Sequence, residues 1–214
     1  MSEDNVVPFN PLDKRHLAES VAQAMFRRPL MAMADIDDFR GAGIYAIYYH
    51  GTFPAYKAIA ARNKGGICTS PIYVGKAIPK GGRKGSDLSA SPGRALYLRL
   101  LQHSRSIEEA ENLELADFSC RYLVADDIWI PLGESLLIAR LGPIWNILID
   151  GFGNHDPGKG RHEGLRPRWD VLHPGRSWAD KCRPREESAG QIITEVRDYL
   201  RNNPPSEDSS LFAW

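Results

Sequence analysis

The chain has 214 residues, of which 43% are apolar and 25% are charged, and its formal net charge is zero. This length and apolar content suffice for one sizeable globular domain and exclude a disordered or collagen-like chain. No run approaches the ~18–20 apolar residues of a membrane-spanning helix, the start lacks a secretory-signal layout, and three separated cysteines argue against a zinc site or a disulfide scaffold. A cytoplasmic protein is therefore expected.

The first half of the chain predicts a helix, two strands and an insertion. Apolar spacing indicates a helix between Asp13 and Met33, with Asp13 as its cap. The β-branched and aromatic runs at 44–49 and 71–75 predict strands. The connection of about twenty residues between them, 52–70, is too long for a tight hairpin, so we expect it to project from the sheet.

The second half predicts helices around one further strand. Residues 94–104 carry a leucine stripe after Ser91-Pro92, and a second short helix at 133–141 ends at Gly142-Pro143. Residues 118–125 read as a third strand, and the amphipathic run 190–202 reads as a closing helix. The apolar stretch 143–149 is expected to be buried, and the final residues to form a loose end. The expected organisation is an N-terminal helical arm (1–40), a core (41–150) and a C-terminal extension (151–214).

The zero net charge conceals strong local bias. Residues 41–105 carry 10 basic side chains against a single acid, and residues 106–150 carry 2 against 9. Residues 151–185 have a net charge of +4, whereas 1–40 and 186–214 have −2 and −4. Two basic blocks separated by an acidic one favour a polarised surface with one face suited to a polyanion, although charge runs are often only solvated faces.

Chemistry-bearing residues follow one another in a recognisable order. They are Gly43-Ile44-Tyr45, Tyr73-Val74-Gly75-Lys76, Arg99 with His103 one helical turn later, Glu134 and Asn146. In this order they resemble the GIY-YIG endonuclease superfamily. The resemblance implies an α/β (α+β) fold with a small three-stranded antiparallel sheet flanked by helices.

The resemblance also implies hydrolysis of a phosphodiester, which needs an activated water and neutralisation of charge on the phosphoryl oxygens. It makes Glu134 the sole protein ligand of one Mg²⁺ per active site, a cation that prefers oxygen and keeps several waters. The alternative is an acid placed near a helix N-terminus for its dipole. Arg99 corresponds to the arginine that grips the scissile phosphate, unless it is only a solvated helix residue.

The proton-transfer groups stay open between Tyr45, Tyr73 and His103. In our preferred arrangement Tyr45 deprotonates the water, His103 takes the proton on, and Tyr73 bonds near the phosphate, but either phenol could simply pack in the core. His103 stands where the family often has tyrosine, and imidazole accepts protons more readily near neutral pH. By resemblance, Lys76 lowers the pKa of a neighbouring phenol and Asn146 holds local backbone.

Two other motifs do not match the binding-site patterns that they resemble. The loop KGGRKGS, residues 80–86, has no G-x-x-x-x-G-K-[ST] pattern, so nucleotide binding is not supported. Asn154-His155-Asp156 with His162-Glu163 lacks the spacing of a helical metal site, so we expect a loop with little direct involvement.

In its size and its basic C-terminal extension, the chain resembles the Type II restriction endonucleases of the superfamily that cut a GC-rich palindrome. The resemblance gives CCGCGG as our guess for the site. The resemblance implies double-stranded DNA as partner, a homodimer on the palindrome, a cognate DNA methyltransferase and a bacterial cytoplasm. A repair or homing-type nuclease, a catalytically inactive DNA-binding protein and an RNA-binding module are the alternatives. Basic side chains expected to contact bases or phosphates are Arg62, Lys64, Arg161, Arg166, Arg168, Arg176 and Lys181.

Overall fold

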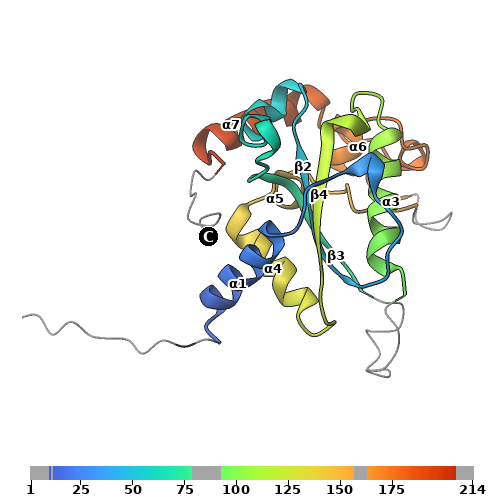
Figure 1. Cartoon of the computed structure of the whole chain (residues 1–214). Helices are drawn as coiled ribbons and strands as arrows, with labels where there is room; N and C mark the ends of the chain where they lie inside the picture. The colour runs from blue at the N-terminus through green and yellow to red at the C-terminus, as the bar shows by residue number, and fades with distance from the viewer. Residues whose placement is uncertain (1–9, 11, 79–92, 157–162, 206–214) are drawn as a thin grey trace, which may run out of the picture.

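The computed structural model describes residues 10, 12–78, 93–156 and 163–205. Its centre is an antiparallel sheet in the order β1-β4-β2-β3, with helices on both faces (Figure 1). The strands are β1 (Met31–Ala32), β2 (Gly43–Tyr49), β3 (Pro71–Ala77) and β4 (Phe118–Val124). The predicted α/β class and the small antiparallel sheet are confirmed, but the sheet has four strands rather than three.

Strand β2 is buried on both faces, which explains why its sequence is a continuous apolar and aromatic run. Successive side chains point to opposite faces. Ile44, Ala46 and Tyr48 pack in one apolar cluster beneath helices α1 (Lys14–Phe26) and α4 (Ile130–Leu141). Tyr45, Ile47 and Tyr49 pack in a second cluster that includes residues of α3 (Ala95–Glu108). The two faces therefore have different neighbours, and only the Tyr45 face meets α3.

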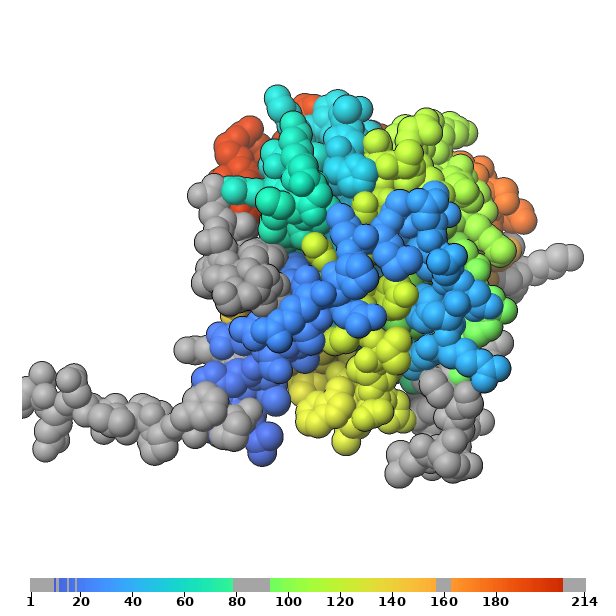
Figure 2. Space-filling view, in the orientation of Figure 1, coloured from blue at the N-terminus to red at the C-terminus, as the bar shows by residue number. Residues whose placement is uncertain are grey.

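The N-terminal helix is shorter than predicted, ending at Phe26 instead of Met33. Pro29 explains the difference, because the residue before a proline avoids the helical region. The chain then pairs as β1 with β4, in the register Met31↔Cys120, and forms the 3₁₀ turn η1 (Met33–Asp35). Figure 2 shows this blue segment lying against the yellow-green chain of β4.

The insertion between β2 and β3 does not project, so that prediction is wrong. It forms η2 (Pro54–Tyr56), α2 (Lys57–Arg62) and η3 (Lys64–Gly66). Tyr56 and Ile59 are buried in the same cluster as Tyr45. Asn63 ties the base of the insertion to the strands, donating from Nδ2 to the Tyr49 carbonyl at 2.8 Å and the Ser70 carbonyl at 2.9 Å. The insertion is a cover of the core.

The C-terminal half folds back over the core. After η5 (Leu115–Asp117) and β4 come α5 (Ile144–Ile147), α6 (Arg168–Leu172), η7 (Ala179–Lys181) and α7 (Ala189–Asn202). The predicted closing helix is α7, and a reciprocal capping box between Ser188 and Gln191 fixes its start. Helix α4 begins at Ile130, three residues earlier than predicted, with Pro131 in its first turn, and Gly142 ends it in the left-handed conformation at φ 55°.

A buried polar chain joins this half to the insertion. Trp145 Nε1 donates to the Tyr56 hydroxyl at 2.9 Å, which lies 2.7 Å from His173 Nε2, and His173 Nδ1 lies 2.8 Å from Asn112 Oδ1. Burial lowers the pKa of His173 to about 3. The histidine is therefore neutral in the folded protein, and its neutral form satisfies both neighbours.

This histidine predicts a loss of stability in mild acid. The unfolded chain binds a proton on His173 as pH falls through ~6.5, whereas the folded protein does not until pH is far lower, so stability is present above pH 6.5 and declines below it. We expect a free energy of unfolding about 2 kcal/mol lower at pH 5 than at pH 7 from this group alone. Urea unfolding at both pH values measures it, with His173→Gln as the variant whose pH dependence should be weaker. Equal stability at the two pH values would contradict the assignment.

Within the described residues, no helix is both long and apolar enough to cross a membrane. Several sequence predictions lie outside the described residues: most of the loop that carries KGGRKGS, Arg161, His162 and the end of the C-terminal tail.

Candidate active site

Four of the expected side chains converge where β2, β3 and α3 meet. The Tyr45 hydroxyl lies 2.6 Å from His103 Nε2, and Arg99 Nε donates to the same hydroxyl at 3.4 Å. The Tyr73 ring lies 6.2 Å from the Tyr45 ring and 5.3 Å from the His103 ring, centroid to centroid. Residues from two strands and a helix, up to 58 positions apart in sequence, thus form one cluster.

The local sequence explains how the cluster closes. Tyr45 pairs with Gly75 across β2 and β3, and the Tyr45 hydroxyl lies over that glycine. A Cβ at Gly75 would lie 2.4 Å from the hydroxyl oxygen, so this position admits no side chain. Arg99 and His103 are one turn apart on α3 and face the strands together.

Burial governs the protonation of the cluster. It lowers the pKa of His103 well below the usual value, and the nearby Arg99 charge adds to the effect, so the imidazole is neutral at physiological pH. Burial also raises the pKa of Tyr45 well above 10 and raises the pKa of Tyr73, with the Arg99 charge acting in the opposite direction. Arg99 is the cation that acts to lower the pKa of both phenols, and the Lys76 ammonium is paired with Glu134, so the expected effect of Lys76 on a phenol pKa stays a prediction.

Glu134 and Lys76 form an ion pair on the α4 side of the edge strand β3. Lys76 pairs in register with Ile44, which packs in the cluster beneath α4, while Tyr45 packs on the opposite face. The Glu134 carboxylate is nevertheless close enough to Tyr45 and Tyr73 for its charge to raise the pKa of both phenols. Glu134 is the fifth residue of α4, whose first turn holds no acid, so the alternative of a helix-terminus acid does not apply.

Asn146 holds the edge strand β3, which lies between the Tyr45 cluster and the Glu134–Lys76 ion pair. Its Oδ1 accepts from the Val74 amide and its Nδ2 donates to the Val74 carbonyl, both at 2.8 Å. The side chain thereby satisfies outward-facing backbone groups of β3 as a neighbouring strand would. This holds the segment Tyr73–Lys76 in place.

The comparison with protein families decides the identity of this arrangement. The family model described as the Eco29kI GIY-YIG domain matches residues 37–200, more than half of the chain. The chain belongs to the Eco29kI family of GIY-YIG restriction endonucleases. No curated protein matched the chain.

The GIY-YIG match continues past Asn146 to Leu200, and a loop in this stretch contacts Arg99 and His103. The Phe152 ring stacks on the His103 ring at 4.5 Å and 19°. Arg99 Nη2 donates to the Gly153 carbonyl at 3.0 Å, and Arg99 Nη1 donates to His155 Nε2. The loop around His155, for which little direct involvement was predicted, therefore contacts two of the expected site residues, and the contacts of Phe152 and Gly153 were not predicted.

The basic residues assigned to DNA divide into buried and accessible groups. Arg176 is 1% exposed and bonds Asp170 through two donors at 2.6 Å, so its assignment to DNA contact is wrong. The Arg168 guanidinium is enclosed by Glu187, Glu195 and the Leu148 carbonyl, which makes it a structural group.

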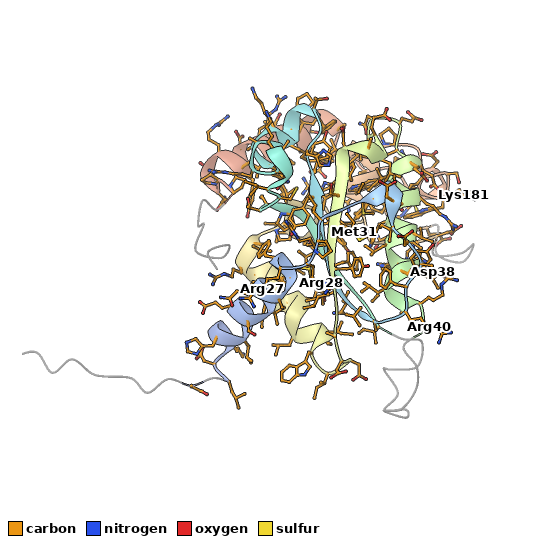
Figure 3. All side chains as sticks on the ribbon, in the orientation of Figure 1. Arg27, Arg28, Met31, Asp38, Arg40 and Lys181 are labelled. Atoms are coloured by element: carbon orange, nitrogen blue, oxygen red, sulfur yellow. The ribbon has the colours of Figure 1, made fainter. Side chains whose placement is uncertain are left out.

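Other basic residues of the GIY-YIG domain stay accessible. Arg166 is partly exposed and pairs with Asp180 at 3.1 Å, whereas Lys64 and Lys181 are exposed, the latter labelled in Figure 3. Arg62 is partly exposed. The accessible side chains among the predicted DNA contacts are thus Arg62, Lys64, Arg166 and Lys181.

Proposed function

We propose that this GIY-YIG protein is a Type II restriction endonuclease that hydrolyses phosphodiesters of double-stranded DNA at a GC-rich palindrome. The observation that carries the proposal is the convergence of the Tyr45 hydroxyl, the His103 imidazole and the Arg99 guanidinium. These are a proton carrier, a proton acceptor and a fixed cation, which are the groups that phosphodiester hydrolysis needs. An inactive DNA-binding protein would have no chemical need for the three together.

The geometry favours a proton path from water through Tyr45 to His103. The neutral imidazole accepts a hydrogen bond from the Tyr45 hydroxyl at 2.6 Å, which turns the lone pairs of the phenol oxygen toward an incoming water. As the water gives its proton to Tyr45, Tyr45 passes its own proton to His103. The phenol stays neutral throughout, which avoids a buried phenolate that its raised pKa disfavours.

Arg99 supplies the fixed positive charge beside this pair. Its guanidinium can present two parallel donors to phosphate oxygens, a geometry that lysine does not match. A bound phosphate would also offset the Arg99 charge that lowers the pKa of His103, making the imidazole a stronger acceptor when substrate is present. Tyr73, partly exposed beside Tyr45, is assigned to the phosphate as a hydrogen-bond donor.

The donor set fits one Mg²⁺. Glu134 offers a partly exposed carboxylate, 17% exposed in its side chain, close enough for its charge to act on both phenols. No group of three or more potential ligands occurs in the described part of the chain, and a single carboxylate leaves room for the waters that Mg²⁺ retains. Glu134 would hold the ion. When bound, Mg²⁺ supplies charge neutralisation at the phosphoryl and leaving oxygens.

Specificity and assembly complete the proposal. CCGCGG remains the proposed site, read by a homodimer because a two-fold palindrome presents the same half-site twice. A methyltransferase of the same specificity in a bacterial cytoplasm would protect the host DNA. The accessible basic residues Arg62, Lys64, Arg166 and Lys181 are the proposed contacts to bases or phosphates.

A plasmid with one CCGCGG site tests the function directly. In Mg²⁺ we expect one linear product with defined ends, no product when the site is scrambled, and none with excess EDTA. Binding to a site-bearing duplex, measured in Ca²⁺, should weaken steeply between 50 and 200 mM salt because neutralised phosphates release counterions. A smear of fragments would instead indicate a repair or homing-type nuclease, and binding without cleavage an inactive DNA-binding protein.

A further inference from the structure

The loop 151–155 makes two sets of contacts with different partners. One set reaches the active site, as described above, through the Phe152 ring, the Gly153 carbonyl and the His155 ring. The other reaches a buried ion pair in the C-terminal half. We propose that Arg176 and Asp170 form an anchor for this loop, and that the anchored loop seats the Arg99 guanidinium for phosphate binding. The inference rests on the proposed function, because it takes Arg99 as the phosphate-binding group.

Arg176 is the centre of the anchor. Its Nη1 donates to the Phe152 carbonyl at 3.1 Å and the Asn154 carbonyl at 3.2 Å, and its Nη2 donates to the Gly151 carbonyl at 3.0 Å. Its remaining donors reach Asp170, which is 2% exposed, through two bonds of 2.6 Å. One side chain therefore satisfies three carbonyls within four consecutive loop residues.

Packing holds the anchor rigid. The Arg176 guanidinium lies 4.4 Å from the Trp169 ring and 4.9 Å from the Trp178 ring, an arrangement in which aromatic faces attract the cation. Both ion-pair members come from the segment that carries α6, outside the strands and helix that hold Tyr45 and Arg99. The anchor is thus hydrogen-bonded to the loop that contacts the catalytic cluster, and the Arg176 charge also lowers the pKa of His103.

The backbone carbonyls of the loop are divided between two arginines, Arg176 and Arg99. The carbonyls of Gly151, Phe152 and Asn154 turn to Arg176, whereas the Gly153 carbonyl turns to Arg99. The Gly153 carbonyl accepts a hydrogen bond from Arg99 Nη2, and His155 Nε2 accepts one from Arg99 Nη1. From α3 and β2, these two nitrogens receive only one long contact among the described residues, 3.4 Å from Nη1 to the Gln102 side chain. Releasing the anchor would let the loop move and free the guanidinium to rotate. Arg176 and Asp170 are thus positioning residues, since neither touches the reacting atoms.

Arg176→Lys is the first test, because lysine keeps the charge but cannot bond three carbonyls and a carboxylate together. We expect kcat for plasmid cleavage to fall about 10- to 100-fold, as misplacement of a catalytic group by about 1 Å does, with Kd for the duplex in Ca²⁺ unchanged. Hydrogen exchange without DNA should accelerate at the Asn154 amide, which donates to the Gly151 carbonyl at 3.0 Å, and not in β2. Asn63→Ala is the control, since it opens buried hydrogen bonds to the Tyr49 and Ser70 carbonyls at the base of the insertion.

Gly153→Ala is the second test and leaves the buried ion pair intact. A Cβ at this position would lie 2.7 Å from the Tyr73 hydroxyl and 3.3 Å from Arg99 Nη2, so it should displace the loop and lower kcat with Kd preserved. Gly190→Ala is its control, because the nearest atom would be 4.0 Å away. If Arg176→Lys does not fold, this variant still tests whether the position of the loop sets kcat.

The outcomes separate the two proposals. Wild-type kcat in Gly153→Ala, or wild-type exchange at Asn154 in folded Arg176→Lys, would overturn the anchor. A loss of kcat in Asn63→Ala equal to that in Arg176→Lys would overturn it as well, because a general loss of stability would then explain both. A wild-type protein that cleaves no DNA would overturn the proposed function, while the exchange measurement would still decide whether Arg176 holds the loop.

Discussion

Glu134→Gln is expected to abolish magnesium-dependent DNA cleavage while leaving the affinity for duplex DNA nearly unchanged. The substitution keeps the shape of the side chain and removes the charge that would hold Mg²⁺. A metal ion contributes several kcal/mol to transition-state stabilisation, and each ~1.4 kcal/mol is a factor of ten in rate, so we expect a loss of at least about a thousandfold. Single-turnover cleavage in Mg²⁺ and duplex binding in Ca²⁺ measure the two quantities.

Glu19→Gln is the matched control for this variant. Glu19 lies on α1 and pairs at 3.6 Å with Arg140, which is on α4 as Glu134 is. Both carboxylates are partly exposed. Exposed ion pairs contribute up to about 1 kcal/mol to stability, so neither variant should unfold the protein. Normal cleavage by Glu134→Gln would remove the metal assignment, and equal losses in both variants would point to helix α4 rather than to its carboxylate.

The positions of the candidate catalytic groups could be predicted because they depend on local rules and on motif order. The alternation of a strand places Tyr45 and Tyr73 on definite faces, and a four-residue spacing places Arg99 and His103 on one side of a helix. The closing helix could be predicted equally well, because its amphipathic run is long and Ser188 and Gln191 form a capping box at its start. These features need no knowledge of distant contacts.

The positions of Arg176 and the insertion depend on distant contacts, and the sequence predicted them wrongly. An arginine in a segment rich in glycine and proline is typical of an exposed loop, whereas this one is buried by carbonyls about 25 residues earlier. The flanking Trp169 and Trp178 were the available signal, because large aromatic residues tend to be buried. Strand β1, two residues long, has no periodicity to detect.

Tyr45→Phe is expected to lower the cleavage rate by a factor of about 10² to 10⁴ without changing the fold. Only the hydroxyl is lost, and with it the link between the attacking water and His103 Nε2. The ring, which is fully buried against the rings of Tyr73 and His103, keeps its packing. Single-turnover cleavage and urea unfolding of the same preparation separate the chemical effect from a structural one.

Tyr48→Phe provides the comparison that gives this result its meaning. Tyr48 lies on the same strand, is equally buried and faces the other cluster, and its hydroxyl has no partner in hydrogen-bonding geometry among the described residues. Deleting a buried hydroxyl without a partner is neutral or stabilising, and cleavage should be unaffected. If Tyr45→Phe cleaved as fast as Tyr48→Phe, the proton would have to leave the water through Tyr73 or directly to His103. The bond between the Tyr45 hydroxyl and the imidazole would then contribute nothing to the rate of cleavage.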